Sequence, residues 1–543
     1  MKHQWHSPGR LRPPHDADLD SALDAMTADE LRSFIRDALE RLDNEPRGHL
    51  VDSLVTRAAK GNSRWRPSSP SRHIVNEVER FAEAARRIGY AEPHEVEDYL
   101  RQGTKAFLAG EHATARAVFE ALLLPIADAE VDLGQHELID EVLTVNVHEC
   151  AAQYAVTVYV TTPLEDRAEA LYQAIDTVHE VASFWEPLEQ MERVATEPLP
   201  DLDAFLPRWV KHLEQEPSSE SEWKRDRDRW LREAVLRLEG VTGLERIARK
   251  TRRPEALRAW CAALVARGEW ADALRAYDDS VGLVGKSHWR GDFLDGAALA
   301  AQQLERRDAT ERLEVAWLGA PSLVRLLRWL GAGTPTVAIL LKRAKKSIKH
   351  CPEKAGRQLG LLHILTADVH AAANLLAQAP GLGWSCEDHP GHVLFPAFAG
   401  LLAEGTRARL SAELFAGLQD TPRDPLEMDC DSDDGTKPKL TTSSIAELIA
   451  SVGPGASIDF QGRAAMLEGM RAAATRRVAG VLGNKRRRHY LHAATLVVCC
   501  LELAPVVGKH KAVSDWVAKV RKKYSRFHAF QDEIKSALAS ISS

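Results

Sequence analysis

The sequence has few cysteines, and their spacing does not form the framework of a disulfide-rich domain. There are seven in 543 residues, an odd number placed at irregular intervals: Cys150, Cys261, Cys351, Cys386, Cys430, Cys499 and Cys500. Secreted domains that depend on disulfides carry many more cysteines in shorter chains. The sequence therefore favours a reducing compartment.

Long apolar segments are also scarce. The first twenty residues lack the apolar core of a signal peptide, and the longest apolar run, residues 491–507, is interrupted by His492 and Glu502. A membrane-spanning helix needs about 20 consecutive, mainly apolar residues. We therefore expect a cytoplasmic protein without a membrane span.

The common signatures of hydrolases and metal enzymes are missing, since the chain contains no HExxH, GxSxG or paired CxxC motif. Residues 280–287, SVGLVGKS, resemble the end of a phosphate-binding P-loop through Gly285, Lys286 and Ser287, but Ser280 replaces the first glycine. A P-loop also needs a buried strand before it, whereas a helical pattern precedes this segment. We interpret it as a turn between two helices.

Two further clusters have partial metal-site chemistry. Cys386, His389 and His392 are close in sequence, but a structural zinc site needs four ligands, and a tight turn before a helix accounts for the same residues. Residues 429–435 resemble a calcium loop, yet Leu440 stands where a bidentate glutamate is required. We predict no cofactor and no bound metal, with the binding of a metal by Cys386, His389 and His392 left open.

Six carboxylates are concentrated in residues 128–141: Asp128, Glu130, Asp132, Glu137, Asp140 and Glu141. Paired carboxylates can act as general acid and base, but only where burial or mutual repulsion separates their pKa values. We interpret this segment as a solvated helix face, with Asp132 near an N-cap. An enzyme with an unrecognised site remains a third hypothesis for function.

Charge is distributed unevenly along the chain. The formal net charge is only −7, but residues 441–543 hold sixteen Lys or Arg and seven Asp or Glu, a net +9, so the preceding residues carry −16. The basic residues form two clusters, one beside Tyr490 and the other beside Tyr524: Arg476, Arg477, Lys485, Arg486, Arg487 and Arg488, then Arg521, Lys522, Lys523 and Arg526. Cations beside aromatic rings suit phosphate neutralisation and base stacking, whereas an acidic protein surface could also pair with them. These residues are the candidate site of a nucleic-acid-binding alternative.

Residues 99–125 have the pattern of a hairpin of two short helices. Gly103 allows the helices to approach closely, Gly110 forms the turn, Ala115 is the small residue at the crossing, and Phe119 fills the gap to the next hairpin. One such hairpin cannot bury its own apolar face, so the pattern predicts an array of them. The remaining patterned segments are also helical, and we interpret the β-branched segment AVTVYVTT as helix because helices flank it.

Near the N-terminus, Thr27 is the expected N-cap of a helix whose apolar stripe is Leu31, Ile35, Leu39 and Leu42. A further helix at residues 49–59 can pack against this stripe. Residues 216–222, EPSSESE, form a polar break that we interpret as the first domain boundary.

The hairpin pattern recurs twice. Residues 257–281 place Gly268 at the turn, Ala273 at the small position and Tyr277 at the aromatic position. A weaker copy has matching offsets at Gly360, Ala367, Ala372, Leu376 and Ala379. The intervals between copies are not a regular repeat of about thirty-four residues, so the array is degenerate.

These hairpins resemble tetratricopeptide-like repeats. A weaker likeness, over residues 223–402 and the segment VRKKYSRFHAFQDEI, is to the helical region of bacterial SWIM zinc-finger proteins, although the motif CxCx(n)CxH is absent and no site follows from that likeness. The tetratricopeptide resemblance implies a right-handed superhelical array with a concave groove for a protein or peptide. It would place Arg116, Arg258 and Arg275 near that groove.

We therefore expect an all-α protein, a tetratricopeptide-like α-solenoid of degenerate helical hairpins with a basic helical C-terminal cap. Its expected parts are a disordered tail (1–18), an N-terminal helical domain (19–215), a second helical-repeat domain (223–418), an acidic loop (419–441) and a basic C-terminal helical domain (442–543). The expected function is that of a non-enzymatic scaffold or adaptor for a protein or peptide partner.

Overall fold

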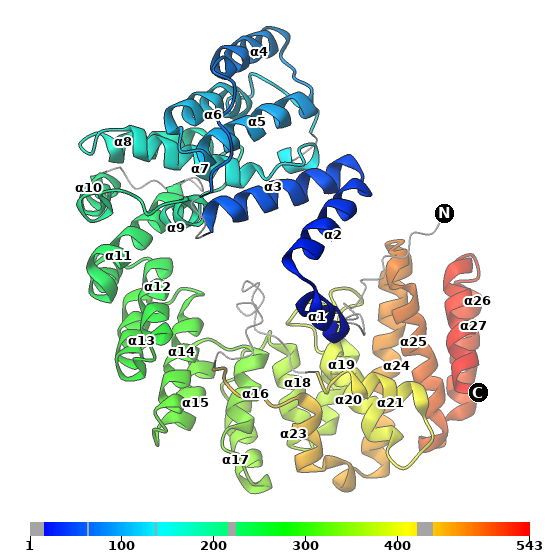
Figure 1. Cartoon of the computed structure of the whole chain (residues 1–543). Coiled ribbons are helices and arrows are strands. Elements are labelled where there is room, and N and C mark those ends of the chain that lie inside the picture. Colours follow the sequence, from blue (N-terminus) through cyan, green and yellow to red (C-terminus); the bar gives the residue numbers. More distant parts are fainter. Residues whose placement is uncertain (1–15, 62–64, 136–137, 216–223, 421–437, 543) are drawn as a thin grey trace. The chain divides into compact units, whose positions relative to one another are not determined.

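The computed structural model describes residues 16–61, 65–135, 138–215, 224–420 and 438–542, and every regular element in these ranges is a helix (Figure 1). The prediction of an all-α protein is thereby confirmed. Most of the expected tail, the polar break at 216–222 and the calcium-like residues 429–435 lie outside the described residues. The chain divides into two compact units, residues 1–244 and 245–543.

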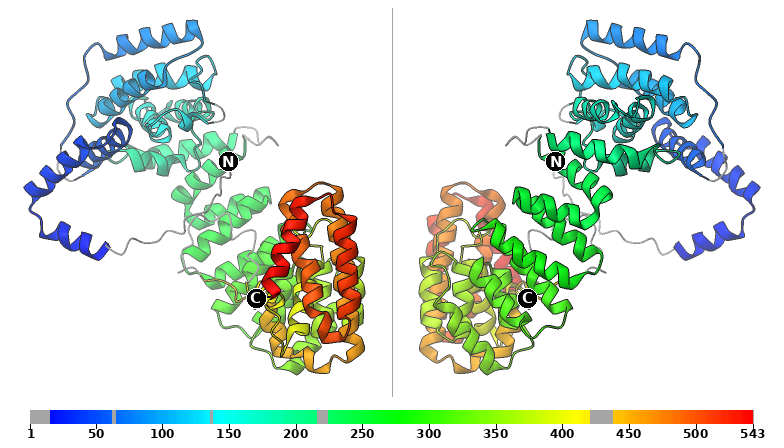
Figure 2. Two further views of the ribbon diagram at one scale, coloured as in Figure 1. Left: turned by 90° about the vertical axis from the view of Figure 1, so that its right-hand side faces the viewer. Right: turned by 90° about the vertical axis from the view of Figure 1, so that its left-hand side faces the viewer.

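The first unit contains ten helices and the beginning of an eleventh in its described part (Figures 1 and 2). They are α1 (Asp16–Ala25), α2 (Ala28–Glu40), α3 (Asn44–Lys60), α4 (Ile74–Ile88), α5 (Pro93–Leu108), α6 (His112–Ala127), α7 (Val147–Thr161), α8 (Arg167–Thr177), α9 (Pro187–Val194), α10 (Leu202–Gln215) and α11 (Lys224–Thr251). All but the last residue of the β-branched segment AVTVYVTT lie in α7, and Thr162 is the extended residue that ends the helix, so the helical interpretation is confirmed.

Helix α2 begins as the sequence indicates but packs less than expected. Thr27 caps it: its Oγ1 accepts from the Glu30 N–H at 3.3 Å, and the Glu30 carboxylate accepts from the Thr27 N–H at 2.8 Å. However, α2 buries none of its side chains, and Phe34 is 59% exposed. The segment therefore forms the predicted helix, but its apolar side chains are not part of a hydrophobic core.

The hairpin α5–α6 has the close packing that the sequence predicts. Gly110 adopts a left-handed conformation, φ +84°, at the turn, and Ala115 is fully buried. A Cβ atom on residue 103 would lie 2.8 Å from Cε1 of Phe119. Gly103 thus permits the approach of the two helices, and the Phe119 ring occupies the space that a side chain at 103 would need.

The acidic segment 128–141 is not a helix face, contrary to our interpretation. Pro125 lies in the last turn of α6, and Ala129 and Gly134 have positive φ values, so the chain leaves the helix and turns. Asp132 caps no helix; its Oδ1 accepts from the Gly134 N–H at 2.7 Å and so closes a tight turn. Only the short 3₁₀ turn η1 (Ile139–Glu141) is regular among the described residues of this segment.

The division between the units lies inside α11 rather than at the polar break. Gly240, with φ +67° and ψ −152°, interrupts the helix, and the residues before it pack on the first unit. The Trp230 indole donates to the Phe184 carbonyl at 2.6 Å, and the Glu233 carboxylate accepts from the Leu188 and Glu189 N–H groups at 3.1 and 2.7 Å. These contacts hold the first half of α11 in the first unit.

Glu233 makes the stability of this contact depend on pH. Burial raises the pKa of its carboxyl to about 7, although the backbone N–H groups of Glu189 and Leu188 oppose that shift. Because the pKa is higher in the folded chain than in the unfolded one, protonation of Glu233 adds stability at low pH, and this is lost as pH rises through 7. We compare the wild type with Glu233→Gln, whose side chain does not titrate. Between pH 4.5 and 8 the free energy of unfolding of the wild type, measured with urea, should fall by up to about 3 kcal/mol relative to that of the variant. A difference between the two proteins that is constant with pH would contradict the raised pKa.

The second unit contains the remaining helices. They are α12 (Pro254–Ala266), α13 (Trp270–Val284), α14 (Arg290–Gln303), α15 (Ala309–Gly319), α16 (Leu323–Gly331), α17 (Val337–Ile348), α18 (Gly356–Leu365), α19 (Val369–Gln378), α20 (Gly391–Ala403), α21 (Arg409–Ala416), α23 (Ile445–Val452), α24 (Phe460–Gly483), α25 (Tyr490–Leu503), α26 (His510–Lys523) and α27 (His528–Ser542). Short 3₁₀ turns are η2 (Pro454–Ser457), η3 (Arg487–His489) and η4 (Ala504–Val507).

The other two predicted hairpins are formed by α12–α13 and α18–α19. Gly268 turns the first with φ +70°, and the Tyr277 ring occupies the position that a Cβ on Gly296 of α14 would need, so it fills the gap to the next helix. In α18–α19 the turn residue is Ala367, with φ +57°, and a Cβ on Gly360 would lie 2.8 Å from Leu394 of α20. In both cases a glycine on one helix leaves room for a large side chain of a neighbouring helix.

The C-terminal helices share one hydrophobic core with the helices before them. This core contains buried side chains from Ala298 to Ala537 and includes Phe395 and Phe398 of α20. The segment Arg487–Val507 is long and apolar enough to cross a membrane, but 61% of its most apolar stretch is buried in this core. It is therefore consistent with a core helix of a soluble protein.

Candidate functional site

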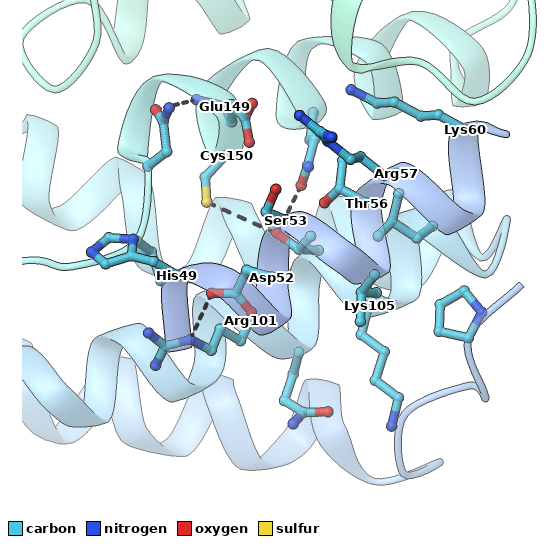
Figure 3. Close-up of a pocket in the computed structure, with 18 residues that line it drawn as sticks. His49, Asp52, Ser53, Thr56, Arg57, Lys60, Arg101, Lys105, Glu149 and Cys150 are labelled. Carbon is cyan, nitrogen blue, oxygen red and sulfur yellow. Dashed lines mark hydrogen bonds and ion pairs between the residues drawn. The ribbon is translucent and has the colours of Figure 1, made fainter. Parts of the chain in front are cut away.

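A polar groove lies in the first unit between α3, α5 and α7 (Figure 3). It encloses about 520 Å³, a volume in the range of pockets that hold small ligands or the side chains of a bound peptide. Ser53 and Thr56 face it from α3, and Cys150 faces it from α7. The helices come from residues about fifty positions apart, so the groove exists only in the folded unit.

A buried carboxylate fixes the wall where α7 begins. Glu97 of α5 is 8% exposed; its Oε1 accepts from the Thr144 N–H, and its Oε2 accepts from the Thr144 hydroxyl at 2.8 Å. Asn146 then caps α7 by accepting from the Glu149 N–H at 3.0 Å. The segment that leads into α7 is thus held against α5 by the hydrogen bonds between Thr144 and Glu97.

Arg101 ties α3 to α5. Its Nε donates to the Asp52 carboxylate at 3.2 Å, its Nη2 donates to the Thr144 hydroxyl at 3.1 Å, and its Nη1 lies 3.3 Å from Glu97. Helix α3 buries little of itself, since Ala59 is its only buried residue among those whose side chains are described. The position of α3 therefore depends on polar contacts more than on apolar packing.

The groove floor is uncharged and unreactive. The Thr104 hydroxyl donates to Oε1 of Gln153 at 2.8 Å and lies 4.0 Å from the Cys150 sulfur. Burial raises the pKa of the Cys150 thiol to about 12, so the thiol stays protonated near neutral pH. A protonated, buried thiol is a poor nucleophile, and this floor suits binding better than covalent chemistry.

Cations predominate at one end of the groove, near the C-terminus of α3. Arg57 and Lys105 have no ion pair with any residue that the structure describes, and Lys60 donates to the Arg193 carbonyl at 2.6 Å (Figure 3). Burial lowers the pKa of the Lys60 amine, and the Glu149 carboxylate partly opposes this. Glu149 is the one lining carboxylate besides Asp52, which is paired with Arg101.

The three arginines predicted to flank a groove lie on three different helices, one in the first unit and two in the second. Arg116 of α6 pairs with Glu120 at 2.8 Å and donates to the Thr161 hydroxyl at 3.0 Å. Arg258 of α12 lies over the Trp289 ring, 5.3 Å from its centroid, and Arg275 of α13 is exposed and paired with Asp272. None of the three lines the groove between α3, α5 and α7.

His389 and the P-loop-like residues 280–287 have structural roles. His389 is 3% exposed, and both of its ring nitrogens are used: Nδ1 accepts from the Gly391 N–H at 3.1 Å, and Nε2 lies 2.8 Å from the Pro380 carbonyl. Within the described ranges, no set of three His, Cys, Asp or Glu residues, Cys386, His389 and His392 included, is placed to hold a metal. Residues 280–284 form the last part of helix α13, and only Gly285, Lys286 and Ser287 belong to the turn into α14 that we predicted.

The two basic clusters meet at one end of the bundle α24–α27. Consecutive helices run in opposite directions there, so the connection 484–489 and the connection 524–527 lie at the same end (Figures 1 and 2). The Tyr490 ring contacts Phe527 at 6.4 Å and Phe530 at 6.0 Å between centroids, which joins the two connections. We call the exposed cations there the basic end: Lys485, Arg486, Arg487, Arg488, Lys522, Lys523 and Arg526.

The other three predicted cations have different surroundings. Arg477 is 5% exposed, and its guanidinium lies 5.8 Å from the Trp384 ring centroid and 3.3 Å from Nδ1 of His492. Arg476 is exposed but donates to the Gln378 carbonyl at 2.9 Å. Arg521 is half-buried and donates to Gln531. Buried Arg477 cannot contact a phosphate in this conformation.

Sequence reasoning missed every residue that lines the groove. Arg57, Arg101, Lys105 and Glu149 lie on three separate helices and match no motif. One signal was available: α5 is the first helix of the hairpin with the clearest sequence pattern, residues 99–125. Comparison of the sequence with protein-family models gives no match, and comparison with curated proteins gives none.

Proposed function

We propose that this protein is a non-enzymatic helical-repeat adaptor whose first unit binds a segment of a protein or peptide partner. The observation that carries the proposal is the polar groove of about 520 Å³ between α3, α5 and α7. Grooves between stacked helices are the usual binding surfaces of repeat proteins. The ligand would contact α5 and α7 and lie against α3.

The lining predicts the chemistry of the bound segment. Arg57 and Lys105 lack partners among the described residues, whereas Asp52 is neutralised by Arg101. A bound aspartate, glutamate or chain-terminal carboxylate could pair with these cations and with Lys60. The neutral donors and acceptors of the floor would then hydrogen-bond to the peptide backbone.

The proposed architecture is a tetratricopeptide-like α-solenoid of degenerate hairpins. Its support is the recurrence of a small residue that admits a neighbouring helix at Gly103 in α5–α6 and at Gly360 in α18–α19. The weaker likeness to the helical region of SWIM zinc-finger proteins contributes no site. We also propose a cytoplasmic location, which the free cysteines of the described residues fit.

The test is selection from a display library of random peptides, followed by affinity measurement on the full-length protein. The expected result is enrichment of peptides with acidic side chains, and a loss of affinity of at least about tenfold for Arg57→Glu with Lys105→Glu. The matched control is Arg208→Glu with Lys211→Glu, which makes the same charge change at two exposed positions of α10. The control should bind like the wild type.

Two results would overturn this proposal. One is the absence of any enriched acidic peptide from the selection. The other is an equal loss of affinity in the groove variant and the α10 control, since long-range attraction by net charge would then account for binding.

A further inference from the structure

The basic end of the second unit carries positive charge that nothing in the described chain neutralises. None of its seven cations forms an ion pair with a described residue. Neither residues 484–491 nor residues 516–531 contain an Asp or Glu. The nearest acidic residue after the second connection, Asp532, pairs with Lys535 at 3.4 Å. This surface therefore has a strong and uniform positive potential.

The basic end is held rigidly by the bundle beneath it. The connections are short, and the Gln531 amide donates to the carbonyls of Arg521 and Tyr524 at 3.2 Å each. Tyr490 is 4% exposed and packs on Phe527 and Phe530, so the first connection is anchored on the second. The cations are presented together at little further cost in backbone entropy on binding.

The aromatic side chains do not serve as a stacking platform, contrary to our expectation from sequence. The Tyr490 ring is inside the core, and the half-buried Tyr524 ring packs edge-on against Phe527 and Phe530. Base stacking needs an open ring face. The basic end therefore offers charge–charge and hydrogen-bond contacts to phosphate without reading the bases.

We propose that the basic end binds the phosphodiester backbone of a nucleic acid without sequence preference. A protein partner fits less well, because protein interfaces have an apolar or aromatic centre and are depleted of lysine. Leu491, at 56% exposure, is the one exposed large apolar side chain that the described residues place beside these connections. The four arginines supply forked donors suited to phosphate oxygens.

The test is fluorescence anisotropy of the full-length protein with duplex DNA and duplex RNA of about 20 base pairs, at several salt concentrations from roughly 50 to 200 mM. Affinity should fall steeply with salt and change little between unrelated sequences. The variant Arg486→Glu, Arg487→Glu, Arg488→Glu should bind at least about tenfold more weakly at the lowest salt, and its log–log salt slope should be smaller by about 2 to 3. Charge reversal at Lys522, Lys523 and Arg526 should give a similar loss, because both connections form one surface.

The matched control reverses two lysines of α17, Lys342 and Lys345, and the residue that follows the helix, Lys349; all three are exposed and have no ion pair among the described residues. It changes net charge by the same amount in the same unit, and we expect its affinity to stay within about twofold of the wild type. Three results would overturn the proposal: no binding at the lowest salt, an equal loss in the α17 control, or displacement of the duplex by polyglutamate at an equal concentration of negative charge.

Discussion

A valine at position 103 is expected to destabilise the first unit by about 3 kcal/mol or more. In the native hairpin a Cβ atom there would lie 2.8 Å from Cε1 of Phe119 and 3.1 Å from Cγ1 of Val118, and both of these residues are fully buried. Neither neighbour can turn toward solvent, so α5 and α6 must separate. Hydrogen–deuterium exchange of the peptides covering α5 and α6, together with thermal unfolding of the full-length protein, measures this effect.

The matched control is Gly282→Ala in α13. No atom lies within 4 Å of where its Cβ would be, and the position is exposed with ordinary helical backbone. Alanine should therefore be neutral there or add up to about 1 kcal/mol of stability through its higher helix propensity. Unchanged exchange in α5 and α6 of the Gly103→Val protein would mean that the helices do not pack as closely as the structure has them.

The parts of the fold that the sequence predicted are those determined by local chemistry. Thr27 and Glu30 form a capping box three residues apart, and Gly110 and Gly268 adopt the positive φ values that their turns require. Gly103 allows the close approach of two helices that we predicted, but the Phe119 ring, expected to fill the gap to the next hairpin, lies against Gly103 inside its own hairpin. Each of these features depends on residues no more than sixteen positions apart in the chain.

The parts that sequence could not supply depend on distant residues. The apolar stripe of α2 predicted a buried face, but burial needs a second surface, and α2 buries none of its side chains. The polar break at 216–222 suggested a boundary, but Trp230 and Glu233 bind residues some forty-five positions earlier and hold α11 in the first unit. Composition alone does not reveal such pairings.

The two candidate surfaces also differ in whether the sequence could have predicted them. The groove joins single residues from three helices, so no pattern along the chain marks it. The basic end could have been predicted, because two short connections separated by a pair of antiparallel helices must lie at the same end of a bundle. What sequence could not show was which cations are usable, since burial removes Arg477 and the core takes up Tyr490.

Replacing Glu97 by alanine should cost about 3 kcal/mol and loosen the groove. The change leaves the Thr144 N–H without its acceptor and removes the carboxylate that lies 3.3 Å from Nη1 of Arg101. Because Arg101 also holds Asp52 of α3, exchange should rise in α3 and in the segment that leads into α7. Urea unfolding and hydrogen–deuterium exchange of the full-length protein measure the two effects.

Asp98 provides a matched control for Glu97 on the same helix. It also lies near Arg101, at 3.7 Å, but its side chain is 77% exposed, so Asp98→Ala should change stability by no more than about 0.5 kcal/mol. Glu97→Gln keeps an acceptor for Thr144 but loses the charge beside Arg101, and we expect an intermediate loss of about 1 to 2 kcal/mol. If Glu97→Ala reduced stability as little as Asp98→Ala does, the contact of Glu97 with Arg101 would not be what positions α3. An intermediate value for the glutamine variant, with exchange rising mainly in α3, would instead separate the two roles of Glu97: its bonds to Thr144 fix the start of α7, and its charge holds Arg101 and, through it, α3.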